Sequence, residues 1–216
     1  MSRKIYNLII LDRSGSMSSM RNEAVASVNE TIGTIKSFIN ENPDSQQTIS
    51  LVTFCCCSRN YIYDMNDARI ADHIKAEDYQ PCCGTPLYDA IGEACTRLHK
   101  TIENEKDAAV SVTIITDGYE NASQEWNHEA IKSLIEQYKK EGWLFAYIGA
   151  DHDVESVAFS LSIDNHMKFD KSSDGFCEMS RVESKARKNW MDKVCFDLDS
   201  PIGGFCTNYF SCPDKD

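Results

Sequence analysis

The stretch IYNLIILDRSGSM, residues 5–17, decides which kind of fold this chain adopts. Residues 5–11 form a nearly continuous apolar run, which is typical of a strand buried on both faces of a parallel sheet. The run ends at Asp12 in a cluster of turn-forming residues, and apolar side chains then recur at helical spacing from about residue 19 to residue 40. The order of strand, turn and amphipathic helix predicts the start of an α/β domain.

The same alternation continues along the chain. Further strands are predicted at residues 48–54, 60–63, 109–115, 143–148 and about 167–169, and further helices at residues 87–103, 127–140, 154–161 and 175–194. Strands that alternate with helices imply crossover connections and a mainly parallel sheet. We therefore expect a three-layer, Rossmann-like α/β fold with helices on both faces of the sheet and one short antiparallel edge strand at residues 60–63.

The chain of 216 residues is long enough for one domain with a single core. It contains no internal repeat and no linker rich in Gly, Ser or Pro. Beyond residue 196, Pro201, Gly203 and Gly204 argue against regular structure. We expect residues 1–195 to form the domain and residues 196–216 to form an irregular C-terminal extension.

The charge balance excludes several functions. With 22 Lys and Arg against 34 Asp and Glu, the net charge is −12, whereas binding to nucleic acid needs clustered basic side chains. The basic stretch at residues 185–193 is interpreted as a solvated helix face. No apolar run reaches the roughly 18 to 20 residues of a membrane-spanning helix, and residues 5–11 lack the cleavage site of a secretion signal. We expect a cytoplasmic protein that binds neither nucleic acid nor membrane.

Ten cysteines are present, including the adjacent residues 55–57 and the pair Cys82 and Cys83. Their spacing matches no disulfide framework, and no CxxC pair occurs, so a structural zinc site has weak support. We expect reduced thiols that act as small apolar side chains. Oxidation of Cys82 or Cys83 remains an alternative with consequences for the neighbouring Thr85.

Oxygen-bearing side chains follow two of the predicted strands. Asp12, Ser14 and Ser16 come after the first strand, Asp117 comes after residues 109–115, and Thr85 precedes the helix that begins near residue 87. Ligands of parallel α/β sheets bind at the carboxyl ends of the strands, so these three segments are expected to meet. Carboxylates and hydroxyls suit a hard cation, above all Mg²⁺, which keeps exchangeable waters. Helix capping by the serines and a simple turn at Asp117 are the alternative interpretations.

The pattern Asp12-x-Ser14-x-Ser16, Thr85 and Asp117 resembles the metal-ion-dependent adhesion site of the von Willebrand factor A (vWA) domain family. The segments GTPLYDAI, residues 84–91, and TDGYEN, residues 116–121, are similar to bacterial, cytoplasmic members of that family. The resemblance covers about residues 4–163 and implies the vWA fold.

The resemblance also implies roles for these residues. Ser14 and Ser16 would bind Mg²⁺ directly, Asp12 and Asp117 would act mainly through water, and Thr85 would bind directly once a ligand is present. Mn²⁺ or Ca²⁺ would be substitutes, and residues 81–86 would be the movable loop. Glu120 and Asn121 are expected to form a surface turn, and Asp151 and Asp153 are expected to cap the helix from residue 154.

The function favoured by this pattern is Mg²⁺-dependent binding of an acidic side chain or carboxylate on another protein. Bacterial relatives work beside ATPases or stress-response components, which the resemblance suggests as partners. One alternative is a metal-dependent phosphoryl-transfer or hydrolytic enzyme, although Ser14 stands where an aspartyl phosphatase needs a second acid, and no nucleophile elbow or phosphate loop occurs. We therefore expect no catalysis. The other alternative is a scaffold with an inactive metal site.

Overall fold

Six strands form one sheet in the computed structural model, which describes residues 3–105, 107–150 and 153–211. The sheet order is β3-β2-β1-β4-β5-β6. Every neighbouring pair is parallel except β2 and β3. The strands are β1 (Lys4–Asp12), β2 (Gln46–Cys55), β3 (Ser58–Asp67), β4 (Ala108–Thr116), β5 (Leu144–Gly149) and β6 (Asn165–Lys168). The expected mainly parallel sheet with an antiparallel edge strand is confirmed.

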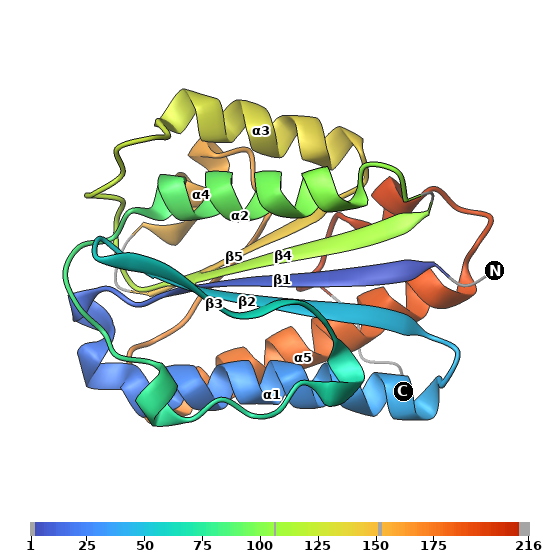
Figure 1. Ribbon diagram of the computed structural model, residues 1–216, viewed down its shortest axis with the longest axis horizontal. Coiled ribbons are helices and arrows are strands. Elements are labelled where there is room, and N and C mark those ends of the chain that lie inside the picture. The colour runs from blue at the N-terminus through green and yellow to red at the C-terminus, as the bar shows by residue number, and fades with distance from the viewer. Residues whose placement is uncertain (1–2, 106, 151–152, 212–216) are drawn as a thin grey trace.

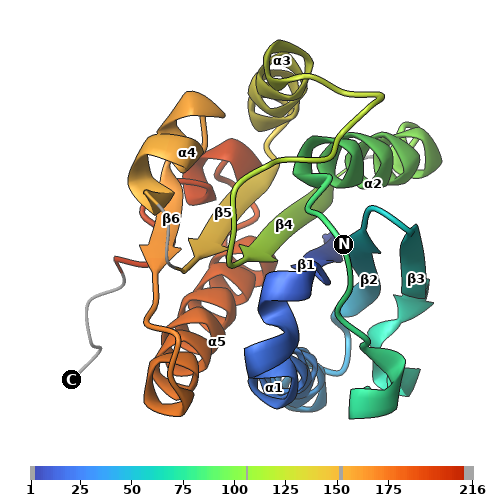
Figure 2. The same cartoon turned by 90° about the vertical axis from the view of Figure 1, so that its left-hand side faces the viewer.

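Helices cover both faces of the sheet (Figures 1 and 2). One face carries α1 (Arg21–Glu41) and α5 (Ser173–Phe196), and the other carries α2 (Leu87–Ile102), α3 (His128–Lys140) and α4 (Val154–Ser160). Alternate residues of β1 enter the two cores: Ile5 and Ile9 pack toward α1 and α5, whereas Leu8 and Ile10 pack toward α2. A strand that is buried on both faces in this way explains the continuous apolar run.

The chain order creates a crevice beside β1. The chain leaves β1 toward β2 on one side, and later returns to β4 on the other side. Leu11 of β1 is paired with Ile115 of β4, so the residues that follow these two strands leave the sheet side by side. This is the place where parallel α/β sheets bind ligands.

The bounds of the edge strand and of the last strand differ from the prediction. The antiparallel edge strand β3 spans ten residues rather than the four of residues 60–63, and its pairing with β2 shifts register between Ile49 and Val52. An edge strand exposes one side to water and tolerates polar residues such as Asp64 and Asn66, which the hydrophobic pattern does not detect. The last strand, β6, begins at Asn165, two residues before the predicted start.

The basic stretch at residues 185–193 is only partly a solvated helix face. Lys188 lies at the surface and pairs with Glu41, but Arg187 is fully buried. The Arg187 guanidinium donates to Glu183 Oε1 at 2.8 Å and to Thr113 Oγ1 at 2.8 Å. The prediction is wrong for Arg187 because its polar partners lie on strands distant in sequence. These bonds fix α5 to the middle of the sheet.

Residues 197–211 are irregular apart from one short helical turn, η4 (Ile202–Phe205), yet they pack on the domain. Tyr209 is buried, and its backbone N–H donates to Asn165 Oδ1 at 3.0 Å. The Arg3 guanidinium donates to backbone carbonyl oxygens of residues at the end of α5 and beyond it, including Ser200 O at 2.7 Å. Among the described residues, no helix is both long and apolar enough to cross a membrane. The domain boundary at residue 195 stays a prediction.

Candidate metal centre

The five predicted site residues lie together at the carboxyl edge of β1 and β4. Asp12 is the last residue of β1, and both Asp12 and Asp117 are buried. Ser14 and Thr85 are also buried, whereas Ser16 is exposed at the mouth of the site. The segments that carry these residues are separated by up to about a hundred positions in the chain and meet only because the sheet order places them together.

Asp12 is held by hydrogen bonds from both sides. Its Oδ1 accepts from the backbone N–H of Ser14 at 2.7 Å, and its Oδ2 accepts from Thr116 Oγ1 at 2.6 Å. The hydroxyl of the buried Tyr79 donates to the backbone carbonyl of Asp12. Burial raises the pKa of the Asp12 carboxyl to about 6, because the bonds from Thr116 and Ser14 offset only part of the desolvation and the charge of Asp117 opposes ionisation.

The two serines join the carboxylates into one network. Ser14 Oγ lies 3.0 Å from Ser16 Oγ, and Ser16 Oγ donates to Asp117 Oδ1 at 2.6 Å. Neither serine caps the helix that follows: Ser14 makes no capping bond to the short helix η1 (Gly15–Met20), and Met20 occupies the N-cap position of α1. The capping interpretation is therefore not supported.

Asp117 is paired with a cation that the sequence did not reveal. Lys171, in the loop between β6 and α5, places its Nζ 2.9 Å from Asp117 Oδ2. That oxygen is buried, and the Lys171 ammonium balances its charge. A metal ion that binds this oxygen would compete with the ammonium for it.

Thr85 is positioned by a residue expected to lie in a surface turn. Asn121 Oδ1 accepts from the Thr85 backbone N–H at 2.8 Å, and the Asn121 N–H donates to the Thr85 carbonyl at 3.1 Å. A Cβ added at Gly118 would lie 3.9 Å from both Ser16 Oγ and Thr85 Oγ1, which shows that the two hydroxyls flank this glycine. Asn121 therefore sets the distance between the loop of Thr85 and the end of β4.

Acidic residues beyond the five oxygen donors also fix the surrounding loops. Glu120 Oε2 accepts from the backbone N–H of Tyr88 at the start of α2. The buried Asp89, which the sequence did not single out, accepts from three successive backbone N–H groups, including Trp126 N at 2.8 Å. Asp153 caps α4 as predicted, by accepting from Ser156 N, while Asp151 lies outside the described residues.

The segment that follows β1 is hydrogen-bonded to two neighbouring segments. Arg13 N donates to Phe54 O of β2 at 2.7 Å, and Arg13 O accepts from Cys82 N at 2.9 Å. Gly15 N donates to Cys83 O at 2.9 Å. The segment that carries Asp12, Ser14 and Ser16 is thus bonded on one side to the end of β2 and on the other side to the loop that carries Thr85.

The donor set fits a hard divalent cation. The five side chains offer only carboxylate and hydroxyl oxygens, and the two carboxylates balance a double positive charge. Burial and the charge of Asp117 raise the pKa of the Asp12 carboxyl, and a divalent cation beside the two carboxylates would offset that charge.

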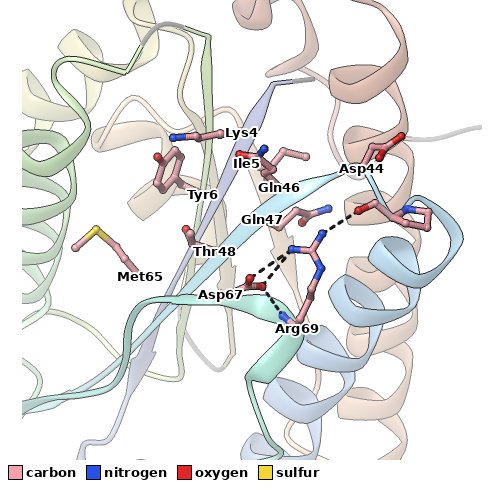
Figure 3. A pocket seen from close by; sticks show the side chains of 11 residues that line it. Lys4, Ile5, Tyr6, Asp44, Gln46, Gln47, Thr48, Met65, Asp67 and Arg69 are labelled. Carbon is pink, nitrogen blue, oxygen red and sulfur yellow. Dashed lines mark hydrogen bonds and ion pairs between the residues drawn. The ribbon is translucent and has the colours of Figure 1, made fainter. Parts of the chain in front are cut away.

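A separate hollow of about 620 Å³ lies at the amino ends of β1 and β2, the edge of the sheet opposite to the five oxygen donors (Figure 3). Its charged groups are already paired. Arg69 contacts Asp67 and donates to the carbonyl of Pro43 at 2.9 Å, and Lys4 pairs with Glu105 at 2.9 Å. The hollow therefore offers fewer unsatisfied polar groups than the edge at Asp12.

Several solved structures share this arrangement of strands and helices. No family model matches the sequence, and no curated protein matches it significantly. Among solved structures, a von Willebrand factor type A protein from Catenulispora acidiphila is 14% identical to this chain, with a TM-score of 0.61. The match covers 86% of this chain and 43% of that protein. The pilus adhesin SpaC from Lactobacillus rhamnosus GG is 12% identical, with a TM-score of 0.65. That match covers 86% of this chain and 30% of SpaC.

A third solved structure matches over almost its whole length. The vWF domain of the type V pili tip protein Mfa5 from Porphyromonas gingivalis is 9% identical with a TM-score of 0.58, and the match covers 84% of this chain and 95% of that domain. This chain spans less than half of the first two structures. At these identities the likeness shows the fold alone, and the fold is that of a von Willebrand factor A domain.

Proposed function

We propose that this chain is a Mg²⁺-dependent protein-binding module. The observation that carries the proposal is the convergence of two buried carboxylates, Asp12 and Asp117, with three hydroxyls at one edge of the sheet. In this proposal Ser14 and Ser16 bind the ion directly, and Asp12 and Asp117 hold its waters. Thr85 joins the ion when a partner binds.

The partner supplies an Asp or Glu side chain or a C-terminal carboxylate. With a net charge of −12, the domain repels an acidic group unless a cation lies between them. Mg²⁺ keeps exchangeable waters, so a partner carboxylate replaces one of them and gains a strong ionic contact. Two of the structures with this fold are a pilus adhesin and a pilus tip protein, which is consistent with a role in protein interaction.

The proposal includes no chemical step. The hydroxyls of Ser14 and Ser16 bond to each other, and Ser16 donates to Asp117, so the proposal gives both serines the role of metal ligands rather than nucleophiles. Binding alone uses every group that the site presents. We also propose a cytoplasmic location, where thiols stay reduced, and an ATPase or stress-response component as the partner.

Isothermal titration of Mg²⁺ into the metal-free chain tests the proposal. We expect one bound ion per chain, and we expect the heat to be lost in Asp12→Asn, which keeps the shape of the side chain but removes its charge. The control is Asp44→Asn, at the exposed opposite edge, which should bind Mg²⁺ like the wild type.

A partner pull-down distinguishes the binding module from a scaffold with an inactive metal site. We expect a partner to be retained with Mg²⁺ and released by a chelator, and to be lost with Asp12→Asn. Retention of the same partner under all three conditions would show that the helices, rather than the ion, make the contact.

A further inference from the structure

Five cysteines gather beside the metal site, where the turn between β2 and β3 meets the loop that precedes α2. Cys55 Sγ lies 2.9 Å from Cys82 Sγ, and Cys57 Sγ lies 2.8 Å from Cys83 Sγ. The sulfurs form two groups of three, and within each group all sulfurs lie within 4.8 Å of one another. One group is Cys55, Cys57 and Cys82, the other is Cys56, Cys57 and Cys83, and Cys57 belongs to both. We call these five residues the thiol cluster.

The expectation that the cysteines serve as small apolar side chains holds for the buried Cys55 but is wrong for the three exposed members of this cluster. Cys56, Cys57 and Cys83 are exposed, so they fill no core. Cys83 also has a φ of 53°, a backbone conformation that favours glycine, and yet it carries a side chain that contacts Cys57. The sequence spacing gave no sign of a site because the ligands come from two short runs that only the fold brings together.

Positive and N–H groups point at the sulfurs. Arg13 Nη2 lies 3.3 Å from Cys55 Sγ, and the backbone N–H of Gly84 donates to Cys56 Sγ at 3.3 Å. Such groups stabilise the negative charge of thiolate ligands around a metal. A hollow of about 350 Å³ opens beside residues 55–57 and gives an ion a path from solvent.

We infer that the thiol cluster binds one Zn²⁺ ion through four thiolates, with Cys55, Cys57 and Cys82 as the core of the site and Cys83 or Cys56 as the fourth ligand. Zinc–sulfur bonds of about 2.3 Å in a tetrahedron place sulfurs about 3.8 Å apart, so the thiols need only small side-chain shifts. Binding releases the four thiol protons to solvent, and no electron is transferred. The resulting charge of −2 is partly offset by Arg13.

The ion would join two segments that are otherwise linked by few bonds. Cys55 and Cys57 belong to the hairpin of β2 and β3, while Cys82 and Cys83 belong to the loop of Thr85. Backbone bonds between Cys56 N and Gly84 O, at 3.1 Å, already align the two segments. The thiophilic site is separate from the oxygen-donor site, and the inference does not rest on the proposed Mg²⁺ function.

The test is a titration of Zn²⁺ into the full chain, reduced with a non-chelating phosphine, in excess Mg²⁺ and against a chromophoric chelator. We expect one equivalent of Zn²⁺ to bind, and Cys57→Ser to weaken the affinity at least tenfold because both sets share this sulfur. The matched control is Cys177→Ser, an exposed cysteine of α5, which should bind Zn²⁺ like the wild type. Asp12→Asn should also keep Zn²⁺ binding, which separates this site from the oxygen-donor site.

Alkylation of the wild type gives a second measurement that does not depend on the folding of a variant. Zn²⁺ should slow the modification of Cys57, Cys82 and Cys83 and leave Cys177 as reactive as before. No Zn²⁺ uptake by the reduced wild type, or equal uptake by Cys57→Ser, would overturn the inference. Disulfides between Cys55 and Cys82 and between Cys57 and Cys83 in a chain that takes up no Zn²⁺ when reduced would assign the cluster to redox chemistry instead.

Discussion

Asp12 carries an electrostatic cost that the metal-free protein cannot avoid. Its side chain is fully buried at the end of β1, and burial together with the nearby Asp117 raises the pKa of Asp12 to about 6. In the unfolded chain the pKa is close to the ordinary value of 3.8. The folded state therefore holds the proton more tightly than the unfolded state, and ionisation of Asp12 near neutral pH opposes folding.

The first prediction concerns the pH dependence of stability. The contribution from the raised pKa is complete below pH 3.8 and is lost as the pH rises through about 6, so without metal this group lowers the free energy of unfolding by about 2 kcal/mol over that interval. Urea unfolding of the wild type and of Asp12→Asn in chelator, from pH 4 to pH 7, measures the difference. The variant should lack this decline, and an equal slope in both proteins would refute the assignment to Asp12.

The second prediction concerns Lys171, whose ammonium contacts Asp117 Oδ2 at 2.9 Å. This cation and a divalent ion compete for the same carboxylate, so we expect Lys171→Met to raise Mg²⁺ affinity several-fold. It should also lower metal-free stability by about 1 to 3 kcal/mol, because Asp117 is left buried without its partner. Calorimetric titration and urea unfolding measure the two effects, with Lys168→Met at the exposed end of β6 as the control. Lower Mg²⁺ affinity in Lys171→Met would show that the lysine supports the ion instead.

At the scale of single residues, the sequence predicts the site residues that form a local motif, but it does not predict the residues that contact them from distant segments. Asp12, Ser14 and Ser16 stand within five positions, and the order of strand and turn identifies them. Lys171 contacts the Asp117 carboxylate, and Tyr79 donates to the backbone carbonyl of Asp12. Both come from segments that carry no motif, so nothing in the sequence connects them to the site. The cysteines of the thiol cluster were dismissed for the same reason, because their proximity arises only in the fold.

The loop of Thr85 depends on Asn121, and this dependence gives the third prediction. Asn121→Ala leaves the buried Thr85 N–H without its acceptor, which costs about 1 to 3 kcal/mol of stability and loosens the loop. We expect Mg²⁺ affinity to fall as well. Asn127→Ala removes the capping bond of α3, at a cost of about 1 kcal/mol, but should leave Mg²⁺ affinity unchanged.

Calorimetric titration of both asparagine variants provides the comparison. Equal Mg²⁺ affinities in Asn121→Ala and Asn127→Ala would show that Thr85 needs no such support, or that it takes no part in metal binding.

The fourth prediction concerns helix α5. The contacts that hold this helix against the sheet could not be predicted from the sequence. Arg187 is fully buried against Glu183 and Thr113, so Arg187→Met leaves a buried carboxylate unpaired and should cost about 3 to 5 kcal/mol. Adding Glu183→Leu should recover part of that loss. Urea unfolding of the single and double variants measures the coupling. Strictly additive losses would mean that the two side chains act independently.

For most elements, periodicity was sufficient to locate the strands and helices to within a few residues. Residues buried on both sides, such as those of β1, give an unmistakable apolar run. The edge strand β3 was underestimated because water on one side removes the need for an apolar pattern there. The sequence also does not predict that the tail packs on the domain through Tyr209. A single buried aromatic residue in an irregular segment produces no periodic hydrophobic pattern.

For the molecule as a whole, the sheet order explains why the functional groups meet. Placing β1 between β2 and β4 brings the ends of three strands together. Four of the oxygen donors lie at the ends of β1 and β4, three cysteines lie at the end of β2, and the loop before α2 adds Thr85, Cys82 and Cys83. The strong negative charge makes a bridging cation the natural means of binding another acidic surface. The two proposed ions differ in hardness, so oxygen and sulfur ligands separate them chemically although they lie on neighbouring loops.

The central claim is that one divalent cation binds among the five oxygen donors. The most direct measurement is the anomalous difference density of a crystal grown with Mn²⁺, which occupies such sites and scatters anomalously. We expect a single strong peak enclosed by the side chains of Ser14, Ser16 and Thr85, with Asp12 and Asp117 next to it. A crystal in which this edge of the sheet shows no peak, while the five side chains keep their positions, would contradict the account.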